Sequence, residues 1–360
     1  MRSTHLQPCE TFCKRLCKTF YNGYIESMVK IQEVAKLAGV SLTTVSHVIN
    51  HRDRVSPVMR AKVEEAIEKL GYVPNRQAQS LRTGRTKVIA IMIPDICAPY
   101  YTEMVRSMQT ALVDDGVDAL IYNTDVPGGH SEDHGHTYLK QIKTKGVDGL
   151  IVADAALHRI QHELAAVKIP TVFIGNLPSK AIDSIEQDNF ASAYLMGEYL
   201  AAKGHRRIAH VTGPSFFNMS MLRQAGFERA LKDAGVEVPD ELRFEGSFLP
   251  PSGYEAVDWL LGTHSDNLPS AIFFASSRMA RAALAAFSDR GVLVPQDIAV
   301  ASYDIYEELA DLRPRLTTIG VSPSDLGRGA IELLNERIAG FDGPPRQVVL
   351  PASLEIHATA

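Results

Sequence analysis

The sequence predicts a small all-α head joined by a linker to a two-lobed α/β core. Three short helical patterns lie between residues 31 and 70, and a polar, basic stretch with few core-forming residues follows at 74–86. From Val88 onward, apolar strands alternate with amphipathic helices. A chain of 360 residues with 45% hydrophobic and 22% charged content is typical of two or three globular domains.

The head shows clear helix start and stop signals. The first pattern, I-Q-E-V-A-K-L-A, is expected to end at Gly39, because glycine adopts a positive φ without strain. Ser41 can cap a second helix, L-T-T-V-S-H-V-I, and Ser56 with Pro57 can start a third that Gly71 ends. The apolar face of the first helix comprises Ile31, Val34, Ala35, Leu37 and Ala38.

Two short helices joined at Gly39 form a helix-turn-helix, whose second helix is shaped to lie in the major groove of DNA. Ala35, Val40 and Val45 are small or apolar where these helices must touch. The outer face of the second helix then carries Leu42, Thr43, Thr44, Ser46 and His47.

Charge is distributed unevenly along the chain. Residues 28–87 hold eleven Lys and Arg against five Asp and Glu, whereas residues 88–360 carry a net charge of -13. A basic segment ahead of an acidic body is expected when that segment contacts a polyanion. No apolar run is long enough to span a membrane, so a cytoplasmic protein is expected.

The core is predicted to contain parallel sheets covered by helices on both faces, because near-continuous apolar strands alternate with helices. Strands are expected at 88–93, 117–122, 147–153, 170–174, 207–211, 271–275 and 298–302. Helices are expected near 100–115, 133–145, 189–203, 222–235, 252–262, 278–290 and 323–339. This number of units indicates two lobes, and ligands in such folds bind beyond the carboxyl ends of the strands.

The run A-K-L-A-G-V-S-L-T-T-V-S-H-V-I-N, with R-V-S-P and G-Y-V-P-N-R-Q-A-Q-S-L-R-T-G-R-T after it, resembles the LacI/GalR family of bacterial repressors. The resemblance begins at Val29 and extends to the C-terminus. It implies a helix-turn-helix head, a periplasmic-binding-protein-like core and a homodimer that binds double-stranded, pseudo-palindromic operator DNA. It also implies that a small-molecule effector, such as a sugar or sugar derivative, modulates operator affinity.

The sequence pattern and the resemblance together imply the following domain boundaries. Residues 1–27 are expected to be a disordered or spurious extension before a true start at Met28, 28–73 the DNA-binding head, 74–86 a hinge helix and 87–360 the effector-binding and dimerisation core. Within the core, the N-lobe is expected at about 87–187 and 318–345, and the C-lobe at about 188–317 and 346–360. The chain ends L-E-I-H-A-T-A, too short for the added C-terminal helix of tetrameric relatives, so a dimer is expected.

The resemblance implies that three residues contact DNA bases and so read the operator sequence: Leu42, Thr43 and His47. It assigns phosphate contacts to Lys30, Ser41, Thr44, Ser46, Asn50 and Ser56. In the hinge, Leu81 would enter the minor groove, with Asn75, Ala78 and Gln79 beside it. His47 departs from the arginine usual in the family, and a histidine offers guanine one donor instead of a bidentate fork, so the operator sequence is in doubt.

Candidate effector-binding residues come from strand ends and from the resemblance. The strand ends supply Asp95, Tyr100, Tyr101, Asn123 and Thr124. The resemblance adds Arg223, Phe248, Ser276 and Asp304. Ser276-Ser277 replaces the family's N-D, and Gly175 stands where relatives often carry aspartate, so the acidic and amide partners of a sugar are reduced. A sugar acid, a phosphorylated sugar, a nucleoside or no ligand at all remain alternatives.

Other classes of protein are disfavoured. The chain lacks a G-x-S-x-G elbow, a Walker motif and a G-x-G-x-x-G after a strand, so we expect no enzyme and no cofactor. His130, His134 and His136 are interpreted as a solvated turn that could bind a metal weakly. Cys9, Cys13 and Cys17 do not follow a well-attested metal-ligand spacing. A transport binding protein would need export and no DNA-binding head.

Overall fold

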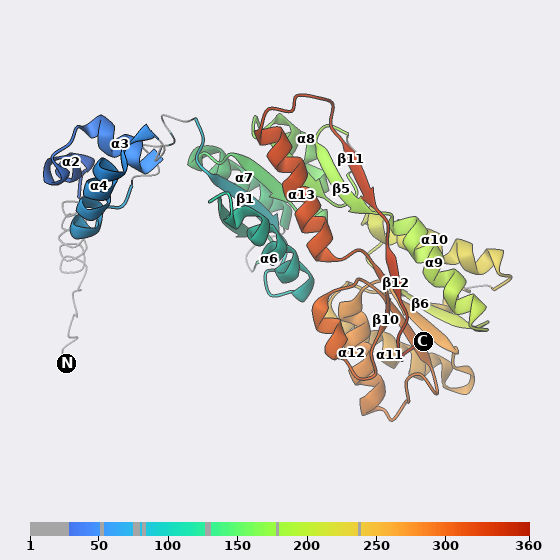
Figure 1. The fold of residues 1–360 in the computed structure, drawn as a ribbon. Coiled ribbons are helices and arrows are strands. Elements are labelled where there is room, and N and C mark those ends of the chain that lie inside the picture. The colour runs from blue at the N-terminus through green and yellow to red at the C-terminus, as the bar shows by residue number, and fades with distance from the viewer. Residues whose placement is uncertain are drawn as a thin grey trace, which may run out of the picture. The chain divides into compact units, whose positions relative to one another are not determined.

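The computed structural model describes residues 29–50, 54–74, 80, 84–126, 131–177, 180–236 and 239–360 (Figure 1). The chain divides into two compact units, one ending at Gly84 and the other running from Arg85 to Ala360. Within the described residues, no helix is both long and apolar enough to cross a membrane.

The first unit is a three-helix head whose helices match the predicted ones. They are α2 (Ile31–Ala38), α3 (Leu42–Asn50) and α4 (Pro57–Leu70). Gly39 and Gly71 have φ of 66° and 63° and end α2 and α4 as expected. Val34, Val45 and Val63, one from each helix, are fully buried against one another.

One apolar position of the head was predicted wrongly. Leu37 is 52% exposed, although its spacing placed it on the buried face of α2. From α2, Val34 and Ala35 are the residues buried in the contact with α3 and α4, and Leu37 is not part of this cluster.

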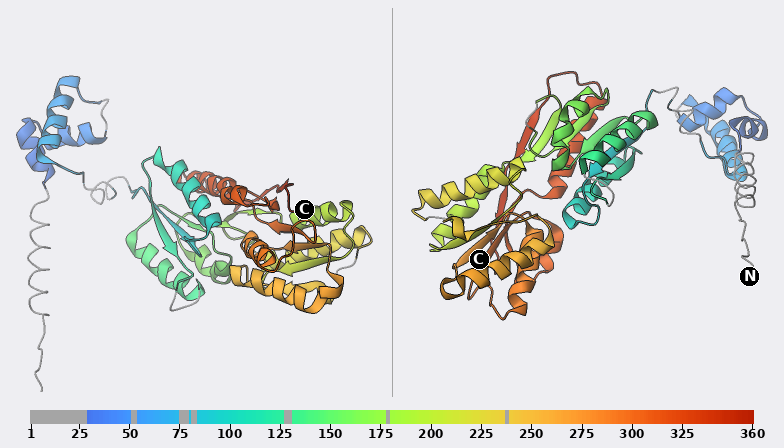
Figure 2. Two further views of the ribbon diagram at one scale, coloured as in Figure 1. Left: turned by 90° about the horizontal axis from the view of Figure 1, so that it is seen from below. Right: turned by 180° about the vertical axis from the view of Figure 1, so that it is seen from behind.

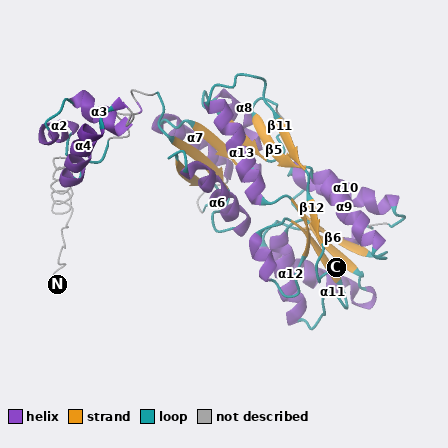
Figure 3. Cartoon of the chain, in the orientation of Figure 1, coloured by secondary structure: helices purple, strands orange, loops and turns teal. Residues whose placement is uncertain are grey.

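The second unit contains two six-stranded sheets with helices on both faces of each (Figures 2 and 3). The first lobe has the strand order β11-β5-β4-β3-β1-β2, and neighbouring strands among those described pair in parallel. Its strands are β1 (Val88–Ile93), β2 (Asp118–Asn123), β3 (Gly149–Val152), β4 (Thr171–Ile174), β5 (Asp183–Gln187) and β11 (Gln347–Leu350).

Alternation along β1 shows how this sheet is covered. Ile89, Ile91 and Ile93 pack under α6 (Pro99–Val113) and α13 (Pro323–Ile338). Ala90 and Met92 face the opposite layer. That layer comprises α7 (Ser131–Lys145), η2 (Ala155–Ile160) and α8 (Gln161–Ala166). Both faces are therefore buried, as the continuous apolar strands predicted.

The second lobe repeats this plan with the strand order β12-β10-β9-β8-β6-β7, of which only the β10–β12 pairing is antiparallel among the described strands. Its strands are β6 (Ile208–Thr212), β7 (Arg243–Glu245), β8 (Ala271–Phe274), β9 (Ala299–Tyr303), β10 (Thr317–Gly320) and β12 (Ser353–Glu355). The helices α9 (Asn189–Ala202) and α10 (Asn218–Asp233) cover one face. The helices α11 (Pro250–His264) and α12 (Ser277–Asp289) cover the other.

The chain passes between the lobes three times, after β5, β10 and β11. The second and third crossings lie a few residues later than the expected boundaries at 318 and 346. Gly320 still belongs to the second sheet, and β11 still pairs with β5 of the first. A short strand such as Q-V-V-L carries no signal in sequence for which of two similar sheets it joins.

The histidine segment is also corrected. His134 and His136 lie in α7, not in a turn, and His130 lies outside the described residues. The His134 ring contacts the Thr124 carbonyl oxygen at 2.8 Å, and the His136 ring contacts the Glu163 carboxylate at 2.9 Å.

Close packing of α10 on α9 depends on Gly226. A Cβ at this position would lie 2.1 Å from the backbone oxygen of Phe190, so the two helices would have to separate. We expect Gly226→Ala to lower the free energy of unfolding by about 1–3 kcal/mol, measured by urea denaturation. Gly262→Ala in α11 is the matched control, because nothing lies within 4 Å of a Cβ there. An equal loss in both variants would contradict this account of the α9–α10 contact.

Candidate DNA-reading surface and effector cavity

The predicted outer face of α3 is accessible in the head. Leu42 is 47% exposed, Thr43 is exposed, and Thr44, Ser46 and His47 are half-buried. Val45 and Val48 on the opposite face are buried, which fixes the rotation of α3 about its axis. The structure therefore brings these five predicted residues to one surface.

Hydroxyl groups hold the start of this surface in place. The Ser41 hydroxyl oxygen accepts a hydrogen bond from the Thr44 backbone N–H at 3.1 Å and lies 2.9 Å from the Thr44 hydroxyl. Ser56 caps α4 by accepting a hydrogen bond from the Met59 N–H. Lys30 is exposed at the start of α2. Asn75, Ala78, Gln79, Leu81 and the side chain of Asn50 lie outside the described residues.

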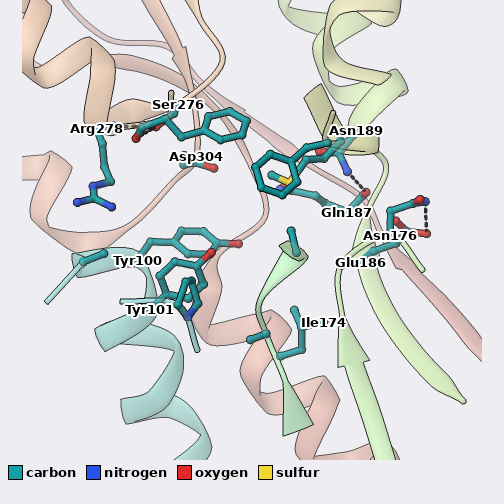
Figure 4. A pocket seen from close by; sticks show the side chains of 18 of the residues that line it. Tyr100, Tyr101, Ile174, Asn176, Glu186, Gln187, Asn189, Ser276, Arg278 and Asp304 are labelled. Carbon is teal, nitrogen blue, oxygen red and sulfur yellow. Dashed lines mark hydrogen bonds between the residues drawn. The ribbon is translucent and has the colours of Figure 1, made fainter. Parts of the chain in front are cut away.

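A cavity of about 480 Å³ lies between the two lobes of the core (Figure 4). Its walls are formed by the segments that follow strands of both sheets, which is where a doubly wound fold binds ligands. Six of the residues predicted as effector contacts line it: Asp95, Tyr100, Tyr101, Arg223, Phe248 and Ser276. Asp304, a seventh, lies directly after β9 and also lines it.

Arg223 is the most constrained polar side chain of the cavity, with 2% of its surface exposed. Its Nε donates to the Asn189 side-chain oxygen at 2.9 Å, and one terminal nitrogen donates to the Ala275 carbonyl at 2.6 Å. The other terminal nitrogen lies 3.9 Å from the Asp304 carboxylate, and the guanidinium stacks 3.6 Å from the centre of the Tyr303 ring. These contacts position a planar donor group at the base of the cavity.

Phe248 and Asp304 are held in strained backbone conformations. Their φ values are +66° and +79°, and among described non-glycine residues only Lys87 shares this region. Such strain tends to occur at ligand-binding positions. The chain also makes room for the Phe248 ring, because a Cβ on Gly213 would lie 2.0 Å from its tip. Phe248 and Asp304, both predicted from the sequence as effector contacts, therefore lie at positions with a strained backbone.

Burial raises the pKa of several groups that line the cavity. It raises the pKa of the Tyr100 and Tyr101 hydroxyls, so both are neutral donors. Burial also raises the pKa of the Asp304 carboxyl, although the nearby Arg223 guanidinium opposes this. The Ser277 backbone N–H lies 3.4 Å from one Asp304 oxygen. Asp304 and Arg223 therefore present an acceptor beside a donor, an arrangement that matches neighbouring hydroxyls of a sugar.

Two polar contacts cross the cavity from lobe to lobe. Arg278 of α12 lies 3.4 Å from the carboxylate of Asp95, which follows β1. The Asn218 amide donates to the Asn176 side-chain oxygen. Arg278 and Asn176 lie on opposite sides of the cavity (Figure 4).

Two predicted contacts are not part of the cavity lining. The Asn123 oxygen accepts from the Ile96 N–H at 2.6 Å, and its amide nitrogen donates to the Asp125 carbonyl. Thr124 is fully buried and donates to the Ile93 carbonyl. Both side chains support the loop that carries Asp95 instead of facing the cavity.

Sequence reasoning missed several lining residues. They include Asp125, His158, Asn176, Glu186, Asn189, Asn218 and Arg278. Glu186 lies in β5, a strand that the sequence did not predict because D-S-I-E-Q has weak apolar character, and Asn189 is the first residue of α9, which follows. Arg278 directly follows Ser276-Ser277, the pair that replaces the family's N-D, so this difference from the family could have drawn attention to it. The lining also contains the amide and acidic side chains of Asn176, Asn189 and Glu186, which the expectation of reduced acidic and amide partners did not take into account.

The described lining carries more negative than positive groups. Its carboxylates are Asp95, Asp125, Glu186 and Asp304. Its guanidinium groups are those of Arg223 and Arg278, and each lies within 4 Å of a carboxylate. No cluster of three metal-ligating side chains exists within the described parts of the chain.

Comparisons with known proteins agree with both units. Residues 30–75 match the model of "Bacterial regulatory proteins, lacI family", and residues 198–359 match the "Periplasmic binding protein-like domain". The chain is 36% identical over 314 residues to the ribose operon repressor of Escherichia coli K12, covering 86% of this chain and 93% of the repressor. It is 34% identical to the HTH-type transcriptional repressor PurR of Histophilus somni, covering 87% of this chain and 93% of that protein.

A solved structure of the lac repressor dimer bound to operator and the anti-inducer ONPF shares the fold with a TM-score of 0.81. The two chains are 28% identical, over 92% of this chain and 99% of that one. The comparisons cover both units, and the chain belongs to the lacI family of bacterial regulatory proteins.

Proposed function

We propose that this protein is a transcriptional repressor whose affinity for operator DNA is controlled by an uncharged sugar bound between the lobes of its core. The observation that carries the proposal is the pairing of Arg223 with Asp304 at the base of the cavity, in a chain that also presents the outer face of α3. The relatives are repressors and not enzymes, and we propose no catalytic activity. A homodimer acting on DNA in the bacterial cytoplasm fits the operator-bound lac repressor dimer.

The charge of the cavity favours a neutral effector. A phosphate or carboxylate would have to displace Asp304 or Asp95 from the guanidinium groups and leave a carboxylate without its partner. A neutral sugar needs no such exchange, because hydroxyls both donate to Asp304 and accept from Arg223. This argues against the sugar acids and phosphorylated sugars that the sequence left open.

On the head, we propose that Leu42, Thr43 and His47 contact bases, with the Leu42 side chain and the Thr43 methyl packing on thymine methyls. Lys30, Ser41, Thr44, Ser46, Asn50 and Ser56 are proposed to contact phosphates, which positions the head without reading sequence. Leu81 remains the proposed minor-groove wedge, with Asn75, Ala78 and Gln79 beside it.

Ligand binding in the cavity can be coupled to operator binding because the cavity is lined by both lobes. A ligand that contacts Asp95 of the first lobe and Asp304 of the second favours whichever lobe arrangement satisfies both. We propose that the core has two lobe arrangements, which hold the paired heads differently for operator binding. The ligand can then change operator affinity only as far as it binds one arrangement more tightly than the other.

The base-reading assignment predicts a specificity change in His47→Arg. An arginine fork can bind guanine through two hydrogen bonds, so one position in each half-site should change preference by about 1–3 kcal/mol. In-vitro selection of operators measures this directly. Arg60→Lys on α4 serves as a control that keeps the charge of the head. Identical selected sequences for wild type and His47→Arg would show that His47 does not read bases.

A further inference from the structure

The first residues of the core, directly after the polar linker, are bound by one carboxylate. Asp148 directly precedes β3, and its side chain is half-buried. One of its oxygens accepts from the Thr86 backbone N–H at 2.7 Å and from the Thr86 hydroxyl at 2.8 Å. Its other oxygen accepts from the Lys87 backbone N–H at 2.8 Å. Both oxygens of Asp148 therefore fix two consecutive residues, through hydrogen bonds that the charge of the acceptor strengthens.

The backbone is strained at the same point. Lys87 has a φ of +55°, and among the described non-glycine residues only Phe248 and Asp304 share this left-handed region. Such a conformation persists only where neighbouring contacts hold it. The Lys87 side-chain nitrogen also donates to the Asp115 carbonyl at 3.0 Å. The direction in which the chain enters the core is therefore set by a turn at Lys87, which its contacts with Asp148 and Asp115 hold.

A second element of the first lobe binds the same segment. The Arg85 guanidinium donates to the carbonyl oxygen of Ile338, the last residue of α13. Gly149, the first residue of β3, packs against α13 so closely that a Cβ there would lie 2.9 Å from the Leu334 side chain. The segment that starts β3 and the C-terminal part of α13 therefore pack on each other, and both bind residues 85–87.

A dimer that binds two half-sites must place its two heads at one separation and one rotation about the DNA axis. A linker that leaves the core in a fixed direction restricts both, whereas a freely pivoting linker would let the heads reach several half-site spacings. We propose that Asp148 is a positioning residue that fixes the linker at the core and thereby makes the protein selective for one half-site spacing. This role rests on the proposed function, because it requires paired heads that bind an operator.

Fluorescence anisotropy titrations of the full chain test this role with the operator selected in vitro and with versions that carry one or two base pairs inserted at its centre. One added base pair moves the half-sites apart by about 3.4 Å and rotates them by about 35° relative to each other. Wild type should bind the one-base-pair insertion at least about 100-fold more weakly than the selected operator, and Asp148→Ala less than about tenfold more weakly. A duplex with a single half-site should bind both proteins equally, because one head needs no defined spacing.

Two further variants complete the test. Asp148→Asn keeps one oxygen that can accept from Thr86 but loses the acceptor for the Lys87 N–H, so its penalty for the insertion should lie between those of wild type and Asp148→Ala. It decides the test if Asp148→Ala does not fold. Asp114→Ala is the control, because it removes an exposed carboxylate at the C-terminal end of α6 in the same lobe and should keep the wild-type penalty.

The outcomes separate this role from the proposed function. A wild-type penalty in the folded Asp148 variants, or a wild type that tolerates the insertions, would overturn the role of Asp148 and leave the proposed repressor standing. Weaker binding of the single half-site by Asp148→Ala, by the same factor as for the selected operator, would also overturn it, because the loss would then lie in the head itself. Absence of operator binding by wild type would overturn the proposed function, and this role with it.

Discussion

Arg223→Ala is expected to weaken effector binding by at least about 100-fold while the head retains its affinity for DNA. The substitution removes the only described donor fork at the base of the cavity and leaves the Asp304 carboxylate and the Asn189 oxygen without this partner. A buried carboxylate that loses its cation should also cost about 3–5 kcal/mol of core stability. Calorimetry with the bound sugar and operator titration measure the two sites separately.

Two further variants keep this prediction testable if Arg223→Ala folds poorly. Asp304→Asn preserves the shape of the side chain and should weaken the sugar by about tenfold or more, because the charged acceptor is lost. Arg229→Ala lies on the same helix and removes a guanidinium that is 63% exposed and paired with Asp233. It should change neither affinity nor stability by more than about 0.5 kcal/mol. Wild-type sugar affinity in a folded Arg223→Ala protein would exclude the proposed site.

Stability of the core is expected to fall as the solution becomes acidic, because of His210 on β6. The side chain is fully buried between the rings of Phe227 and Phe273, and neither ring nitrogen has a hydrogen-bond partner among the described residues. Burial, with a smaller effect of the Arg243 charge, lowers its pKa from 6.5 to about 3. The neutral form is therefore the one that the fold accommodates.

Because the pKa of His210 is lower in the folded chain than in the unfolded chain, acidification lowers the free energy of unfolding. Above pH 6.5 His210 is neutral in both the folded and unfolded chain and contributes no pH dependence. Below pH 6.5 the unfolded chain takes up a proton that the folded chain excludes, so stability falls until the pH reaches the folded pKa of about 3. The slope is about 1.4 kcal/mol per pH unit, so about 2 kcal/mol should be lost between pH 6.5 and pH 5.

Urea denaturation of wild type and His210→Phe at pH 7.5 and pH 5.0 isolates this contribution. The variant keeps an aromatic ring of similar size and should lack this loss, so the two proteins should diverge on acidification. His162→Gln, at an exposed position on α8, serves as a control and should follow wild type. Parallel behaviour of wild type and His210→Phe would mean that His210 is protonated in the folded core without penalty.

The helices and central strands were predictable from sequence because their signals are local. Gly39 and Gly71 end helices in the left-handed conformation that only glycine adopts readily, and β1 is long and apolar enough to be recognised alone. The strands that escaped prediction are short or polar at an edge or crossing, such as β7 and β12. Their identity as strands depends on which neighbour they pair with, and one sequence does not contain that information.

The cavity was predictable only in part for a similar reason. Arg223, Phe248 and Asp304 sit in motifs that mark them, and all three line the cavity. Asn123 also ends a strand, but its side chain turns to cap the neighbouring loop, which a strand-end rule does not distinguish from a ligand contact. Arg278 and Asn176 become site residues only because the two lobes face each other across the cleft.

We propose that a ligand bound between the lobes controls the operator affinity of the heads. The most direct measurement is a titration of the selected operator with the full chain, with and without the tightest-binding sugar at about 100 times its dissociation constant. We expect operator affinity to change by about 5–150-fold in wild type and to remain unchanged by ligand in Arg223→Ala. A ligand that binds the cavity by calorimetry and leaves wild-type operator affinity unaltered would contradict the account.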